Sequence, residues 1–280
     1  MAVRGRGRHS ASLQPVPGTL LGMTHTGPPQ TGTSTGGGRG PAHAARTRIL
    51  AAPAMSVFAV VLAVLCMQAR TGGPLTVLDG PTTDWMVGHR TALMDLIAVV
   101  VTDLASPTVV VAAAVIAAIV LAWQRRSWMV GVVVAASVGG AGAAGELIKT
   151  AVARSRPPAT VHEVFEVDYS FPSGHVTGTT ALVAVLIAVA ATGWGRRRRI
   201  VAATGGGAAV AIVAASRLYL GVHWLTDVIA GVVVGALFAL AGAVALTFDP
   251  TNPAATTLNA RNQAVPPHRT GPRTPTRGVA

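Results

Sequence analysis

Three short clusters in the second half of this sequence contain residue types that could bind an anion and move a proton. The first cluster pairs Lys149, the one lysine among 22 basic residues, with Arg156 seven positions later. Seven residues make about two helical turns, so both cations can face the same way before Pro157 and Pro158 end the helix. Taken alone, the pair is more typical of interfacial anchors whose charged ends reach the lipid headgroups.

The second cluster, Pro172-Ser173-Gly174-His175, stands where an apolar run begins. Free backbone N–H groups and the positive end of the helix dipole favour an anion at a helix start. A glycine there lets the backbone approach a ligand closely, and His175 adds a titratable group on the first turn. By itself, the cluster is more typical of a serine N-cap at a loop-to-helix junction.

The third cluster comprises Ser216-Arg217, His223 and Asp227. His223 and Asp227 are four residues apart and would share one face of a helix. The carboxylate can then accept a hydrogen bond from one ring nitrogen, which fixes the tautomer and leaves the other nitrogen as a nucleophile. An aspartate beside a long apolar segment is a functional candidate, and a structural His–Asp hydrogen bond is the alternative.

The elements that must position these clusters are long apolar segments. Hydrophobic residues make up 51% of the 280 residues and charged residues only 11%, against about 25% charged in a soluble domain. This composition argues against a soluble globular protein, a disordered chain and a disulfide scaffold. A bilayer span needs about 20 apolar residues, and six segments approach that length: 49–69, 107–123, 128–148, 176–194, 200–215 and 224–248. We therefore predict an all-α fold, a bundle of six transmembrane helices.

Residues 82–104 are also apolar, but Arg90, Asp95 and Asp103 interrupt them. An additional span would place Asp95 or Asp103 in lipid, at a cost of roughly 3 kcal/mol each. We therefore predict a helix that lies at the membrane interface before the second span.

Glycines recur at helical spacing in the third and sixth apolar segments. They are Gly139, Gly142 and Gly145 in the third and Gly231 and Gly235 in the sixth. Small residues at this spacing let membrane helices approach closely, so we predict helix contact faces there.

The two ends of the chain differ from its middle. Residues 1–45 and 250–280 are rich in Gly, Pro, Thr and Arg without a helical or strand period, so we predict disordered tails around a membrane domain at 46–249. Six spans would place both tails on one side, together with sixteen arginines and one acidic residue, whereas the other side would hold six basic and nine acidic residues. Positive charge favours the cytoplasmic side. The net charge of +12 thus indicates cytoplasmic termini and gives no support for nucleic-acid binding.

Alternating spans would bring Lys149, His175, Arg217 and His223 to the same, non-cytoplasmic membrane face. Three fixed cations beside a glycine-containing helix start are typical of a phosphate site. Two histidines, one of them backed by a carboxylate, can supply a nucleophile and a general acid. The sequence offers no group of cysteines or carboxylates typical of a metal cage, so we predict phosphoryl transfer without a metal or other cofactor.

Together, the three clusters resemble the type 2 phosphatidic acid phosphatase (PAP2) superfamily. The family pattern is Lys-x6-Arg-Pro, Pro-Ser-Gly-His and Ser-Arg-x5-His-x3-Asp. It fits without insertion at Lys149 to Arg156-Pro157, at Pro172-Ser173-Gly174-His175 and at Ser216-Arg217 to His223 to Asp227. The resemblance covers about residues 84–245 and includes the six-helix layout.

The resemblance implies a role for each of these residues. His223 would attack phosphorus and form a phosphohistidine, and Asp227 would orient and stabilise that histidine. His175 would protonate the leaving oxygen and then activate water. The phosphate oxygens would be bound by Lys149, Arg156, Ser173, the Gly174 amide and Arg217. Arg154 matches no part of the pattern, and we expect it to be a surface charge or a headgroup contact.

A site at headgroup level favours a phosphorylated lipid as the substrate. The family includes phosphatases of undecaprenyl pyrophosphate, phosphatidylglycerol phosphate and phosphatidic acid, and all three lipids are candidates. We expect the loop 158–171, with Glu163, Glu166 and Asp168, to gate the site or to discriminate between headgroups. The bias toward Ala, Val, Arg and Gly is typical of a GC-rich bacterium, so we expect a multi-pass protein of the bacterial inner membrane whose site faces outward.

Four alternatives follow from the same residues. A lipid phosphotransferase would use the same site with an acceptor other than water. A non-catalytic lipid-binding protein would be expected to lack His223, His175 or Asp227, and all three are present. Vanadium haloperoxidases share the three blocks but resemble soluble helical proteins. A transporter would place polar groups near the bilayer midplane, whereas here they gather at one end of the spans.

Overall fold

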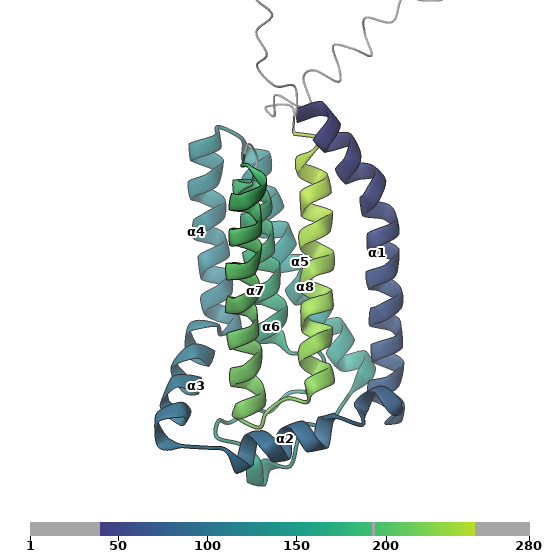
Figure 1. The fold of residues 1–280 in the computed structure, drawn as a ribbon, viewed down its shortest axis with the longest axis vertical. Helices are drawn as coiled ribbons and strands as arrows, with labels where there is room; N and C mark the ends of the chain where they lie inside the picture. The colour runs from purple at the N-terminus through teal and green to yellow at the C-terminus, as the bar shows by residue number, and fades with distance from the viewer. Residues whose placement is uncertain (1–39, 192–193, 250–280) are drawn as a thin grey trace, which may run out of the picture. The chain divides into compact units, whose positions relative to one another are not determined.

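The computed structural model describes residues 40–191 and 194–249 of the chain, and within these residues all regular structure is helical (Figure 1). The α-helices are α1 (Gly40–Thr71), α2 (Asp79–Gly88), α3 (Ala92–Leu104), α4 (Pro107–Arg125), α5 (Trp128–Val152), α6 (Gly174–Ala190), α7 (Arg196–Tyr219) and α8 (Leu225–Leu246). Two short 3-10 turns, Pro74–Thr76 and Ala159–Val161, lie in the loops. The predicted all-α class is confirmed.

Five of the six predicted spans correspond to helices that are long and apolar enough to cross a membrane: α1, α4, α5, α7 and α8. The fourth predicted span corresponds to α6, an apolar helix of 17 residues. It ends at Ala190, short of the predicted end at Trp194, and residues 192–193 lie outside the described part. The chain is therefore a multi-pass membrane protein with five candidate spans.

The ends of the bundle adjoin the segments predicted to be disordered. The first long helix, α1, begins at Gly40, so the last six residues of the segment 1–45 are helical. Residues 1–39 and 250–280, which carry the rest of that prediction, lie outside the described residues. Helix α1 packs mainly along α8 and contacts α5 much less.

The helix pair α6 and α8 forms the most extensive contact in the bundle, and two glycines explain how closely it packs. A Cβ atom on Gly231 would lie 2.9 Å from the carbonyl oxygen of Ser173, and one on Gly235 would lie 2.6 Å from that of Thr177. The predicted contact face is thus confirmed in α8. It is wrong for Gly139 and Gly142 of α5, where a Cβ would meet nothing within 4 Å, because these two residues are exposed.

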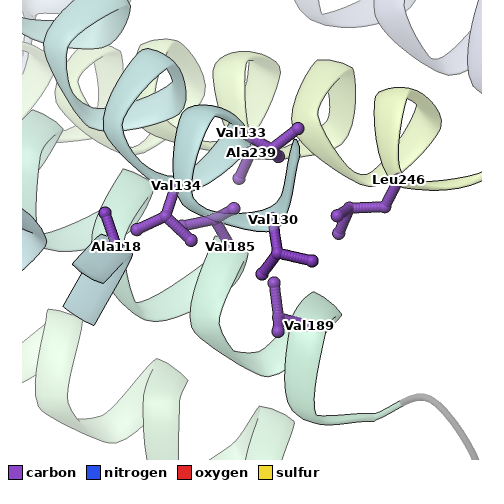
Figure 2. Close-up of a cluster of buried hydrophobic side chains, with 8 residues drawn as sticks. All are labelled: Ala118, Val130, Val133, Val134, Val185, Val189, Ala239 and Leu246. Carbon is purple, nitrogen blue, oxygen red and sulfur yellow. The ribbon is translucent and has the colours of Figure 1, made fainter. Parts of the chain in front are cut away.

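Small aliphatic side chains fill the half of the bundle that is remote from the three motif clusters (Figure 2). Membrane helices associate through close van der Waals packing, which compact side chains permit. The buried set comprises Ala118 from α4, Val130, Val133 and Val134 from α5, Val185 and Val189 from α6, and Ala239 and Leu246 from α8. This packing joins α5, α6 and α8, whose opposite ends carry motif residues.

The segment 82–104, predicted to be one helix, belongs to two helices, α2 and α3. Helix α3 begins after Thr91, whose side chain accepts a hydrogen bond from the Met94 amide at 3.3 Å. Just before this cap, Arg90 donates to the carbonyl oxygens of Val161 at 2.7 Å and Tyr219 at 2.8 Å. The prediction of a single helix was wrong because Thr91 acts as an N-cap within the apolar segment. Figure 1 shows α2 lying across the lower end of the long helices.

Candidate active site

The three motif clusters meet at the end of the bundle where α5 and α7 end and α6 and α8 begin. Lys149 lies on the last turn of α5 and Arg217 on the last turn of α7. His175 is the second residue of α6, and His223 precedes α8 by two residues. Lys149, Arg217 and His223 are 7%, 1% and 1% exposed. Side chains this deeply buried do not reach outward as interfacial anchors, so the burial favours a shared site.

The ring of His223 is held in one orientation by a backbone carbonyl. Its Nδ1 atom lies 2.8 Å from the carbonyl oxygen of Ser170. A carbonyl oxygen can only accept a hydrogen bond, so Nδ1 carries the proton and Nε2 carries the lone pair. The guanidinium of Arg156 lies 3.2 Å from this Nε2 through Nη1, which donates to it. The unprotonated nitrogen of His223 therefore faces the cationic side of the site, where its lone pair accepts from Arg156.

Burial also keeps His223 uncharged. It lowers the pKa of His223 below its ordinary value, and the hydrogen-bonding and charge interaction with Asp227 opposes this only in part. The cations of Arg217 and Arg156 lower that pKa further. A neutral imidazole at neutral pH retains the lone pair that a nucleophile needs.

Asp227 lies beside His223 on the first turn of α8 and is completely buried. Its Oδ2 atom is 3.5 Å from Nδ1 of His223, longer than an ordinary hydrogen bond. The same Oδ2 accepts from the Trp224 amide at 2.9 Å. Asp227 therefore supplies negative charge next to the ring, while the carbonyl of Ser170 is the nearer acceptor. Residue type carries no signal for this role of Ser170, because every residue has a backbone carbonyl.

Arg154, which we expected at the surface, is instead partly buried and paired with the fully buried Asp227. Its side chain is 12% exposed, and its Nη1 donates to Oδ1 of Asp227 at 2.7 Å. Its Nη2 donates to Oδ2 of Asp79 at 2.6 Å, and Asp79 is 3% exposed. Asp79 also accepts from the amide and hydroxyl of Thr226, at 2.9 and 2.8 Å. The expectation was wrong because Arg154 bridges two carboxylates, one of them 75 residues away in the sequence.

Three cations line the site, and the loop between α5 and α6 supplies carboxylates to all of them. Asp168 pairs with Lys149 and Arg156, and Glu166 pairs with Arg156 and Arg217. Burial by itself would raise the pKa of Asp168, but its hydrogen bonds and ion pairs with Lys149 and Arg156 lower that pKa from 3.8 to about 2. We call Lys149, Arg156 and Arg217 the cationic cradle.

Two polar atoms near the cradle have no hydrogen-bond partner among the described residues: the Ser173 hydroxyl and Nε of Arg217. Ser173 stands at the N-cap position of α6, but its side chain forms no capping hydrogen bond. Ser173 thus occupies the N-cap position, as the N-cap alternative predicted, but its hydroxyl does not cap the helix. A Cβ on the adjacent Gly174 would come within 3.8 Å of the Lys149 ammonium. Buried unpaired donors are costly unless a ligand satisfies them.

The part of the chain that carries these residues matches a known protein family. Residues 126–249 match the model of the PAP2 superfamily. This segment, which carries the three motif clusters, is therefore similar to the PAP2 superfamily. All eight residues predicted for the site lie inside the matched segment, whereas Asp79 lies before it.

Two curated relatives are similar to part of this chain. An undecaprenyl-diphosphatase of Sulfolobus acidocaldarius is 34% identical over 97 residues, which are 32% of this chain and 43% of that protein. A decaprenylphosphoryl-5-phosphoribose phosphatase of Mycobacterium tuberculosis is 40% identical over 121 residues, which are 42% of this chain and 60% of that protein. The chain thus spans about half the length of the curated relatives it matches.

A solved structure shares the fold of this chain. It is the first transmembrane PAP2-type phosphatidylglycerolphosphate phosphatase from Bacillus subtilis, with a TM-score of 0.60 and 19% identity. The match covers 77% of this chain and 98% of that one. The helical arrangement around the site is therefore the arrangement of a known membrane PAP2 fold.

The described residues hold no group of three or more His, Cys, Asp or Glu side chains placed to bind a metal ion. The carboxylates at the site pair with Lys and Arg instead. Metal-free chemistry remains a prediction, which chelation can test.

Proposed function

We propose that this chain is an integral membrane lipid phosphatase that transfers a phosphoryl group from a lipid first to His223 and then to water. The observation that carries the proposal is the orientation of His223, whose unprotonated Nε2 contacts Arg156, one of the three cations of the cradle. A nucleophile beside a fixed anion site is what metal-free phosphoryl transfer requires.

In the first half-reaction, the Nε2 lone pair would attack phosphorus, and the bond from phosphorus to the leaving oxygen would break. His175 would give its proton to that oxygen. The imidazolium formed at His223 would be stabilised by the buried charge of Asp227. In the second half-reaction, His175 would take a proton from water, water oxygen would bond to phosphorus, and the bond from phosphorus to Nε2 would break.

The phosphate oxygens would be bound by Lys149, Arg156, Arg217, the Ser173 hydroxyl and the Gly174 amide. The Ser173 hydroxyl and Nε of Arg217 are unpaired donors, so a phosphate would satisfy both. Donors fixed in place act most strongly on the transition state, because they need no reorganisation as charge develops.

The substrate is proposed to be a phosphate or pyrophosphate of a membrane lipid. Undecaprenyl pyrophosphate and phosphatidylglycerol phosphate are supported by the names of the curated relative and the solved neighbour, and phosphatidic acid by the family as a whole. The second curated relative, named for a decaprenylphosphoryl-phosphoribose, adds another polyprenyl lipid to this group.

The proposed topology places the site at the outer face of a bacterial inner membrane. Helix α6 would serve as the sixth span, α2 and α3 would lie at the interface, and residues 46–249 would form the membrane domain. Both termini would then be cytoplasmic, in agreement with the arginines at 125–126 and 196–199.

The test is phosphate release by detergent-purified protein in EDTA, with the candidate lipids offered separately. His223→Ala is expected to abolish release, whereas His89→Ala, which changes an exposed histidine, should retain it. Vanadate should inhibit, since it adopts the trigonal-bipyramidal geometry of the transferring phosphorus. Unchanged release by His223→Ala would refute the nucleophile, and loss of activity in EDTA would refute the metal-free mechanism. Transfer to a second lipid without release would indicate a phosphotransferase.

A further inference from the structure

The loop between α5 and α6 contains a short segment with two chemically different faces. We call residues 165–169 (Phe-Glu-Val-Asp-Tyr) the acidic strap. Phe165 is 90% exposed, Val167 83% and Tyr169 47%. Between them, the carboxylates of Glu166 and Asp168 pair with the cationic cradle. The strap therefore turns its two carboxylates toward the cradle and leaves its apolar side chains exposed.

The two carboxylates bind the cradle in the manner expected of a phosphate. Each one bridges two cations: Asp168 joins Lys149 to Arg156, and Glu166 joins Arg156 to Arg217. No cradle cation lacks a carboxylate partner from the strap. A phosphate that used these cations would therefore have to replace the strap oxygens.

We propose that the acidic strap is an internal occupant of the phosphate cradle, and that a lipid phosphate binds by displacing Glu166 and Asp168 and lifting the strap. The inference rests on the cradle assignment made under the proposed function. Glu166 and Asp168 would then control substrate affinity. Only molecules with an open strap can bind substrate, so the apparent affinity falls in proportion to the fraction of open molecules.

The strap leaves two donors at the cradle without an acceptor, and these donors favour binding of a phosphate over binding of the strap. Two carboxylates leave the Ser173 hydroxyl and Nε of Arg217 without acceptors. A phosphate carries its charge on three free oxygens in one compact group and can accept from these donors as well. When phosphate displaces the strap, it would thus replace the ion pairs of the two carboxylates and also accept hydrogen bonds from the two unsatisfied donors.

The apolar outer face indicates where the strap goes when it opens. Phe165 and Val167 flank Glu166 and are almost fully exposed at the end of the bundle that carries the site. Under the proposed topology this end lies at headgroup level, where aromatic and aliphatic side chains can rest against the membrane surface. A lifted strap would then keep these side chains at the membrane interface.

The first test measures equilibrium binding of inorganic phosphate to the detergent-purified full chain by titration calorimetry. The variants are Glu166→Gln, Asp168→Asn and their combination. The matched control is Glu163→Gln, because Glu163 lies in the same loop but pairs with Arg90 outside the cradle. If the strap is closed in at least about nine molecules of ten, the double variant should bind phosphate about tenfold more tightly or better, and each single variant should fall in between. The control should stay within about twofold of the parent.

Equal or weaker phosphate binding by the double variant would overturn the inference, because the carboxylates would then shape the cradle and not compete for it. A further pair of variants tests the cradle separately. Lys149→Met and Arg217→Gln should weaken phosphate binding in the parent protein. If they do not, the cradle assignment and the proposed function fail. If they do while the double variant gains nothing, only the inference about the strap fails.

A second measurement leaves all four strap ion pairs intact, so it does not depend on the folding of the acidic variants. Val167→Cys in a Cys66→Ala background gives a single thiol on the exposed face, which is labelled with an environment-sensitive fluorophore. Added phosphate should shift the emission with the same dissociation constant that calorimetry gives. No emission change at saturating phosphate would mean that the strap does not move, and the proposal would be abandoned.

Discussion

Replacement of Arg154 tests the buried link between Asp79 and Asp227. In Arg154→Gln, both carboxylates lose their only ion-pair partner of permanent charge among the described residues, although they remain 3% and 0% exposed. Removing one partner of a buried ion pair costs about 3–5 kcal/mol, because the other charge stays out of water unpaired. If α2 holds Asp79 in place, the protein should be destabilised by about this amount.

The assay is thermal unfolding in detergent, followed by tryptophan fluorescence. For a domain of this size, the expected loss corresponds to a Tm decrease of about 6–20 °C. Arg126→Gln, at an exposed arginine in the loop before α5, is the matched control and should change stability by no more than about 0.5 kcal/mol. The double variant Arg154→Gln, Asp79→Asn should recover part of the loss, because one of the two stranded charges is gone.

Activity gives an independent readout of the same link. Without Arg154, the carboxylate of Asp227 is held less firmly beside His223. The acid limb of the pH profile of kcat/KM should therefore shift in Arg154→Gln relative to the parent protein. The reasoning is refuted if Arg154→Gln unfolds at the same temperature as Arg126→Gln. In that case Arg154 would be the surface charge that its position in the sequence first indicated.

Three further predictions concern packing, pH and topology. Gly235→Ala should lower Tm, since its Cβ would lie 2.6 Å from the carbonyl oxygen of Thr177 and force α6 from α8; Gly142→Ala, with nothing within 4 Å, should not lower it. The pKa of Asp168 is about 2 in the folded protein against an ordinary 3.8, so its stabilisation is complete above about pH 4 and is lost as the pH falls toward 2. Tm measured from pH 6 to pH 3 should show this slope, and Asp168→Asn should reduce it; an unchanged slope would contradict the ion pairs. A reporter fused after residue 249 should report a cytoplasmic location, and a periplasmic signal there would invert the topology.

The sequence by itself determined the helical class and the motif residues. Helix lengths follow from apolar runs, so the predicted spans at 107–123 and 128–148 begin at the same residues as α4 and α5. The His223 and Asp227 pair is close because both residues belong to one short segment, where a spacing of four fixes their relation. The positions at which helices end were less predictable. Thr91 caps a new helix within residues 82–104, although the apolar pattern continues across this position.

Only the tertiary structure decided which groups surround that pair. The carbonyl of Ser170 orients His223, and a backbone atom leaves no signature in residue type. Arg154 reaches Asp79 across 75 residues, and Glu166 reaches Arg217 across 51. Such contacts depend on how separate helices pack, which sequence spacing does not encode. The sequence therefore specifies which charges the protein has, and the packing of α2, α5, α7 and α8 specifies which of them are paired away from water.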